Sequence, residues 1–312
     1  MKQKLFFVFF VLTFVAGFLA NFLINKIKTS KEDRITLENQ KKYPLLAKRI
    51  FLENPNDALI SFTPLREKVH DYIDPLGKDF AFYFEYLPTG VSIGINEKLE
   101  FTPLSLIKIP LAITYYYSSS RKGISINQTM TLKEEDIDSG FGSLWQKGVG
   151  YQIDLEEAAR LVLVESDNTA SLVLAHNLPL EIYKEVYSGL DIPIPNDTKL
   201  LRLSTKQYAS ILKALYFSSI LDWVDSNKVL NYLAESKLDN GLRSGVASNI
   251  KVAHKVGILA EELYQDCGIV YPPRRPYLLC MFSKSSERAA YERIGDVSKM
   301  VFDFVSSVNH LK

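Results

Sequence analysis

Strand-like segments stand at both ends of the globular part of this 312-residue chain, and helical patterns fill its middle. Residues 80–86 and 91–95 are strand-like and flank the turn Pro88-Thr89-Gly90, which predicts a hairpin. Three more strand-like segments follow residue 250, at 252–259, 267–271 and 277–282. Because distant segments must then complete one sheet, we expect an α+β fold, with an antiparallel five-stranded sheet flanked by helices and an inserted all-helical lobe.

Helical spacing divides this globular part further. It predicts helices at 65–73, 104–120, 155–165, 205–217 and 291–308, the second of them stopped by Gly123. We therefore expect a sheet lobe at about 61–115 and 245–312, and a helical lobe at about 116–244.

The first residues predict a membrane anchor. Residues 5–24 are twenty residues without a charge, and a helix of that length spans roughly 30 Å, the thickness of a bilayer core. We expect an uncleaved transmembrane signal anchor at 1–25, a polar stalk with short helices at 26–60, and the globular domain at 61–312. Lysines flank the run on both sides, so their count does not fix the orientation.

Composition argues against several classes of function. The 37 basic and 36 acidic residues give a net charge of +1 and no basic stripe, which disfavours a nucleic-acid partner. Four scattered histidines and the absence of HExxH or CxxC patterns disfavour a metal site. Cys267 and Cys280 lie in apolar strand-like runs and suit small core residues better than a disulfide. We expect a monomer without cofactor or metal.

Ser105 and Lys108 are the first residues that indicate chemistry. They stand three apart at the start of a predicted helix, so they share a face. A lysine serving as a base near neutral pH needs a pKa about 3 below its usual value, and apolar neighbours shift it in that direction by desolvation. The pair alone also fits a surface helix with a solvated lysine.

Two later motifs complete a pattern. Ser166-Asp167-Asn168 follows a helical run, and Lys255-Val256-Gly257 lies on a predicted strand. Ser-x-x-Lys, Ser-Asp-Asn and Lys-Thr-Gly occur in this order in class A β-lactamases and penicillin-binding proteins. Over about residues 62–312 the chain resembles that superfamily of serine hydrolases.

The resemblance implies a role for each residue. Ser105 would be the acylated nucleophile and Lys108 its general base or part of the proton relay. Ser166 would pass the proton to the leaving nitrogen, with Lys255 poising its hydroxyl. Asn168 would bind the substrate amide and Lys108. Asp167 would cap local backbone, and the oxyanion hole would be the backbone N–H groups of Ser105 and Ile258, which follows Gly257.

The chain departs from this family at three positions. Val256 replaces a hydroxyl residue that helps to bind the substrate carboxylate, a loss of roughly 0.5–1.5 kcal/mol. The strand after it lacks the arginine of many class A enzymes, and His254 is either a substitute or an ordinary strand residue. The glutamate that activates the deacylating water is also missing: Tyr187 falls at its place, and Glu185 and Asp191 are the nearest carboxylates. Asp191 is the possible replacement base.

These observations leave three functional interpretations. The first is a membrane-tethered, extracytoplasmic serine acyl-hydrolase that opens β-lactams or D-Ala-D-Ala-like peptidoglycan amides through an acyl-serine. The second is a penicillin-binding D,D-peptidase with slow deacylation. The third is a catalytically weak domain that binds cell-wall fragments or partner proteins.

Overall fold

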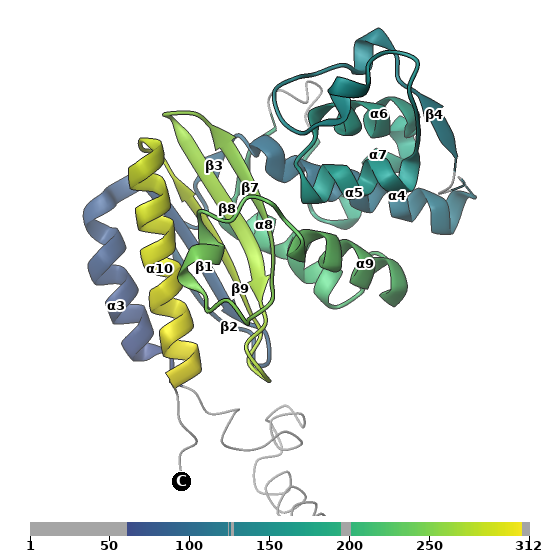
Figure 1. Cartoon of the computed structure of the whole chain (residues 1–312). Helices are drawn as coiled ribbons and strands as arrows, with labels where there is room; N and C mark the ends of the chain where they lie inside the picture. The colour runs from purple at the N-terminus through teal and green to yellow at the C-terminus, as the bar shows by residue number, and fades with distance from the viewer. Residues whose placement is uncertain (1–60, 124, 126–127, 195–200, 308–312) are drawn as a thin grey trace, which may run out of the picture. The chain divides into compact units, whose positions relative to one another are not determined.

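A computed structural model of the chain describes residues 61–123, 125, 128–194 and 201–307, and its first and last strands lie in one sheet (Figure 1). The predicted anchor and stalk lie outside these residues. None of the helices within the described ranges combines the length and apolar composition needed to cross a membrane.

The central sheet has the strand order β2-β1-β9-β8-β7, and all neighbouring pairs are antiparallel. The N-terminal hairpin therefore joins the C-terminal strands through the β1–β9 pair, in which Phe80 is opposite Ser283 and Tyr86 opposite Tyr277. This confirms the predicted α+β fold with a five-stranded antiparallel sheet. The strands are β1 (Phe80–Tyr86), β2 (Val91–Ile95), β7 (Val252–Leu259), β8 (Leu263–Val270) and β9 (Tyr277–Ser283).

Helices cover both faces of this sheet (Figure 1). On one face α10 (Glu287–Ser307) packs on β8 and β9, with α3 (Thr63–Ile73) beside it. On the other face α8 (Thr205–Tyr216) contacts β1, β8 and β9. A Ser204–Gln207 capping box starts α8, because each side chain bonds the other residue's backbone N–H.

The remaining helices and short ladders build the helical lobe and its connections. The helices are α4 (Lys108–Lys122), α5 (Leu155–Val164), α6 (Asn168–Asn177), α7 (Leu180–Gly189) and α9 (Trp223–Ala234). The 3₁₀ turns are η2 (Asp74–Asp79), η3 (Leu104–Ile107), η4 (Glu134–Asp136), η5 (Leu144–Lys147) and η7 (Leu242–Gly245). The ladders pair β3 (Glu100–Phe101) with β6 (Leu203–Ser204), and β4 (Thr129–Thr131) with β5 (Gln152–Asp154).

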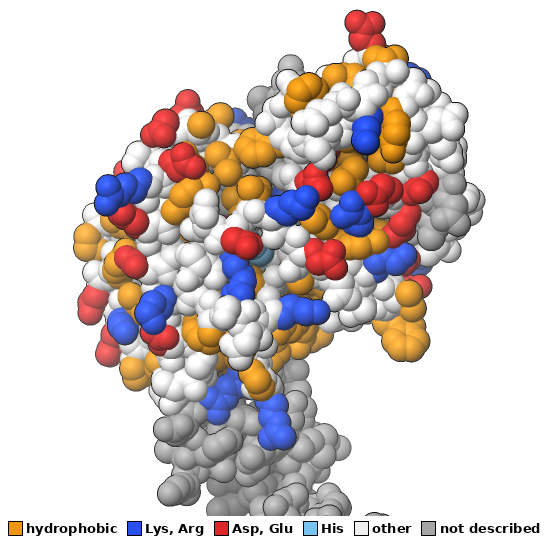
Figure 2. All heavy atoms as spheres, viewed as in Figure 1, with side chains coloured by type: hydrophobic (Ala, Val, Ile, Leu, Met, Phe, Trp, Pro, Cys, Tyr) orange, Lys and Arg blue, Asp and Glu red, His pale blue; other side chains and the backbone are white. Residues whose placement is uncertain are grey.

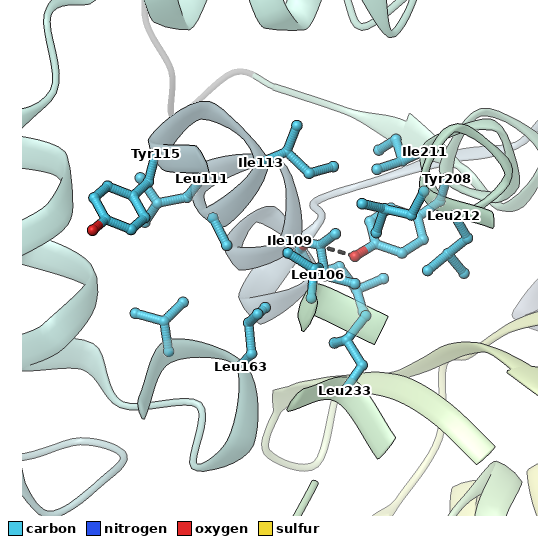
Figure 3. Close-up of a cluster of buried hydrophobic side chains, with 14 of the residues drawn as sticks. Leu106, Ile109, Leu111, Ile113, Tyr115, Leu163, Tyr208, Ile211, Leu212 and Leu233 are labelled. Atoms are coloured by element: carbon cyan, nitrogen blue, oxygen red, sulfur yellow. Dashed lines mark hydrogen bonds between the residues drawn. The ribbon is translucent and has the colours of Figure 1, made fainter. Parts of the chain in front are cut away.

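A hydrophobic core fixes the start of α4. Leu106 and Ile109 are fully buried and lie near α8, whose Tyr208 hydroxyl donates to the Leu106 carbonyl at 2.6 Å (Figure 3). Full burial of a leucine or isoleucine side chain is worth about 1.5–3 kcal/mol. The predicted helix at 104–120 thus begins as the 3₁₀ turn η3, becomes α-helical at Lys108, and ends at Gly123 with φ +70°.

The expectation for the cysteines is wrong. Cys267 and Cys280 are fully buried and form a disulfide between β8 and β9, with a Cα–Cα distance of 4.1 Å. They are register partners in neighbouring antiparallel strands, so both side chains point to the same face. Strand β8 begins at Leu263, four residues earlier than predicted, and only the correct register reveals this pairing.

Candidate active site

The turn η3 presents Ser105 at the junction of the sheet and the helical lobe. Leu104 adopts φ +47°, an unfavourable value for a leucine, and it places Ser105 half-exposed at the start of the helical segment. Contacts on both sides hold this backbone: Gln265 Nε2 donates to the Thr102 carbonyl at 2.8 Å, and Tyr208 holds that of Leu106. Strain maintained by surrounding contacts is typical of functional sites.

Lys108 lies beneath this turn and points toward the Ser166–Asn168 segment. Its side chain is only 5% exposed, and Nζ donates to Ser166 O at 2.5 Å and Asn168 Oδ1 at 2.6 Å, with Ser166 Oγ at 3.3 Å. In the described structure no hydrogen bond joins Nζ to the Ser105 hydroxyl, although catalytic hydrogen bonds are often long before a substrate binds.

Burial changes the acidity of this lysine. Desolvation lowers the pKa of Lys108 to about 8, against a weaker opposing effect of the Asp167 and Asp138 carboxylates. This is the direction that the apolar sequence around Ser105 and Lys108 predicts. A lysine of this kind holds a useful fraction of neutral amine near neutral pH.

The Ser166-Asp167-Asn168 segment forms the turn between α5 and α6. Ser166 has φ +56° and is 2% exposed. Asp167 caps α6 by accepting from the Ala170 N–H at 2.8 Å, and its other oxygen accepts from the Ser143 and Leu144 N–H groups at 2.7 and 2.8 Å. Asp167 therefore holds backbone, and it ties a neighbouring loop to the site.

Strand β7 brings the third motif to the same place. It is an edge strand of the described sheet and packs against η3. Gly257 faces that turn, since a Cβ there would lie 3.2 Å from Leu104 Cβ. Lys255 lies on the same face of β7 as Gly257, because side chains two residues apart on a strand point the same way, and it is 1% exposed. Burial and the charge of Lys108 hold the pKa of Lys255 well below its usual value. Val256 is buried and Ile258 is half-exposed.

Asp138 is a polar residue that the sequence reasoning missed. Its Oδ1 accepts from Asn168 Nδ2 at 2.9 Å and from the Gly140 N–H at 2.7 Å. The turn Asp138-Ser139-Gly140 has the composition of an ordinary loop, so only the fold shows that this carboxylate lies one side chain from Lys108.

Two other candidates, His254 and Asp191, lie away from these contacts. His254 is on the opposite face of β7, 1% exposed, with Nδ1 2.9 Å from Asp266 Oδ1, so it is a buried strand residue. Burial disfavours its cation, but the carboxylates of Asp266 and Asp239 raise the pKa of His254 to about 9. Asp191 is exposed just beyond the end of α7, with φ +54°.

The positions considered for the missing glutamate lie in or next to α7. Tyr187 is inside that helix and 3% exposed. Glu185 accepts from the Tyr117 hydroxyl at 2.5 Å. Within the described residues, neither carboxylate, Glu185 nor Asp191, contacts Ser105 or Lys108.

Comparison with known families decides the assignment. Residues 64–305 match the family described as the beta-lactamase enzyme family. The chain belongs to the beta-lactamase enzyme family. It is thus a β-lactamase-like serine hydrolase, and the resemblance inferred from the three motifs is confirmed. A comparison with curated proteins gives no match.

Solved structures share the fold of this family member. PBP-A aligns with a TM-score of 0.70 and 20% identity over 77% of this chain and 95% of its own. A β-lactamase from Sphaerobacter thermophilus aligns with a TM-score of 0.71 and 20% identity over 79% of this chain and 98% of its own. A class A β-lactamase from Mycobacterium abscessus aligns with a TM-score of 0.69 and 18% identity over 78% of this chain and 99% of its own.

Proposed function

We propose that this family member acylates Ser105 with β-lactams or with D-Ala-D-Ala-like amides of peptidoglycan, and that it releases the acyl group slowly. The observation that carries the proposal is Lys108, a buried lysine with a pKa of about 8 that is bonded to both Ser166 and Asn168. A hydrolase that uses a serine nucleophile needs such a base beside it.

The proposed acylation uses five polar side chains of the site. The Ser105 oxygen forms a bond to the amide carbonyl carbon while its proton moves to the neutral Lys108 amine. As the carbon–nitrogen bond breaks, Ser166 donates its hydroxyl proton to the leaving nitrogen and regains one from Lys108. Lys255 stabilises charge beside Ser166, and Asn168 orients the acyl amide. The developing oxyanion is assigned to the Ser105 and Ile258 N–H groups.

Slow deacylation is expected from the positions of the carboxylates nearest to the place of the missing glutamate. Hydrolysis of the ester needs a base that activates water, and a positioned base is worth about 10²–10⁴-fold. Glu185 is engaged by Tyr117 and Asp191 is exposed beyond α7, which supports the absence of such a base among the residues that the structure describes. Among the solved neighbours, a PBP-A mutant was obtained as an acyl-enzyme with penicillin G.

Substrate binding on the carboxylate side is proposed to be weak. Val256 offers no hydroxyl and is 4% exposed, and His254 is engaged by Asp266 on the other face of the strand. We assign Gly257 and the Ile258 backbone, rather than the Val256 side chain, to contact with the substrate.

The test is covalent labelling by a fluorescent penicillin. The wild-type chain is expected to carry one label on Ser105, and Ser105→Ala none. Ser283→Ala, which removes a fully buried hydroxyl on β9, two strands away from β7, is the matched control and should label normally. A Ser105→Ala protein that still carries an adduct on another residue contradicts the assignment.

Residues 5–24 are further proposed to tether the domain to the membrane, with the domain outside the cytoplasm. The uncharged run is long enough to span a bilayer. The Cys267–Cys280 disulfide supports an oxidising compartment, because disulfides are rare in the cytosol.

A further inference from the structure

Asp138 is held in place by the helix that carries the Ser-Asp-Asn motif. Its backbone N–H donates to Thr169 Oγ1 at 3.0 Å, and this hydroxyl donates to the Asp138 carbonyl at 3.1 Å. Thr169 is fully buried, and Asp138 is half-exposed. The loop residue is therefore fixed to the first turn of α6 while its carboxylate remains open to solvent.

The Asp138 carboxylate also determines which hydrogen-bonding groups of Asn168 remain free to bind a substrate. A carboxamide has two N–H donors and one acceptor oxygen. The oxygen of Asn168 accepts from Lys108, and one N–H position is taken by Asp138 Oδ1 at 2.9 Å. One N–H remains for the acyl amide carbonyl that the proposed function assigns to Asn168. The atoms of the substrate just beyond that carbonyl must then lie close to Asp138.

The charge of Asp138 is maintained and has no ion-pair partner among the described residues. Hydrogen bonds from Asn168 and from the Gly140 N–H hold the pKa of this carboxyl below its usual value. Gly140 keeps the space open, because a Cβ there would lie 2.9 Å from Asn168 Nδ2 and 3.0 Å from Asp138 Oδ1.

We propose that Asp138 is a specificity-determining residue that favours acyl donors with a cationic group next to the amide carbonyl bound by Asn168. The inference rests on the proposed function. For a peptide donor, the cation would belong to the residue that precedes the acylating D-amino acid. For a penicillin, it would be an ammonium on the carbon attached to the side-chain carbonyl.

Three penicillins test this inference, because they differ in charge at that carbon. Ampicillin carries an ammonium there, benzylpenicillin is neutral, and carbenicillin carries a carboxylate. Their second-order rates of Ser105 acylation are measured on the full chain by competition with a fluorescent penicillin. A half-exposed charge pair is worth about 0.2–1 kcal/mol, so each step in the order ampicillin, benzylpenicillin, carbenicillin should lower the rate by roughly 1.4- to 5-fold.

Asp138→Asn removes the charge and retains an oxygen that can accept from Asn168. The three rates should converge in this variant, while Glu134→Gln, which neutralises an exposed carboxylate on η4, should keep the order. Added salt should also reduce the wild-type preference, a readout that does not depend on the folding of a variant.

Two outcomes overturn the inference alone. They are equal labelling by all three penicillins in the wild type, and an unchanged, salt-insensitive order in Asp138→Asn. Failure of all three penicillins to label Ser105 would overturn the proposed function and this inference with it.

Discussion

The pKa of Lys108 predicts how the rate of Ser105 acylation depends on pH. With a pKa of about 8, roughly 9% of the lysine is neutral at pH 7, against about 0.03% for a lysine at its usual value of 10.5, a gain of about 300-fold. The acylation rate should rise about tenfold per pH unit up to pH 7.5 and level off above pH 8.5.

Two variants separate this lysine from other titrating groups. Lys108→Met, of similar length and without a proton acceptor, should lose the rise and react about 10²–10⁴-fold more slowly. Asp138→Asn should move the midpoint of the profile to lower pH, because the carboxylate raises the pKa of Lys108.

Stopped-flow acylation with a fluorescent penicillin from pH 6 to 9.5 gives these profiles. The rate of acylation is measured rather than turnover, since slow deacylation would hide the dependence. A wild-type profile that is flat over this range, or one that still rises tenfold per pH unit at pH 9.5, would refute a Lys108 of pKa about 8 as the base. A rise that persists in Lys108→Met would assign it to another group.

Three further predictions concern stability, deacylation and location. Asp167→Asn cannot accept all three backbone N–H bonds that Asp167 accepts, so we expect it to lower the free energy of unfolding by about 2–4 kcal/mol, measured by urea denaturation. The control variant Glu134→Gln should lower it by less than about 0.5 kcal/mol. Equal losses in the two variants would show that the capping role of Asp167 is minor. Asp191→Asn should leave the steady-state rate of penicillin hydrolysis unchanged, whereas accumulation of acyl-enzyme only in the variant would make Asp191 the replacement base. Protease added to intact cells should remove the chain from about residue 43 onward, and full protection would contradict the extracytoplasmic location.

The parts of the fold that follow from local pattern were predictable. Residues 80–86 are consecutively apolar or aromatic apart from Glu85, and the strand β1 has these same bounds. The backbone conformation at the start of the helix that follows Ser105 was harder to predict from the sequence. The backbone at Leu104 is held at φ +47° by Tyr208 and Gln265, which follow it by about 100 and 160 residues. Tertiary contacts override local propensity there.

The candidate site divides in the same way. Ser105, Lys108 and Asn168 could be named as candidates because residue type and spacing carry their chemistry, and in the structure Lys108 bonds Ser166 and Asn168. Asp138 could not, because a half-exposed aspartate in a turn looks like any solvated loop residue.

The cysteine pair was missed for another reason. It depends on the register of β8 against β9, in which a shift of one residue would turn Cys267 to the other face. Local hydrophobic pattern does not determine that register.

Ser105 is proposed to be acylated readily and deacylated slowly, and time-resolved intact-mass spectrometry with benzylpenicillin follows both steps. We expect one covalent adduct per chain, on Ser105, that forms within the mixing period and persists for many minutes. The hydrolysed penicillin released over the same period should show a burst of about one equivalent followed by a slow steady state, as expected without a positioned base. Rapid turnover with no adduct and no burst would contradict slow deacylation, and a chain that gains no mass at all would contradict acylation of Ser105.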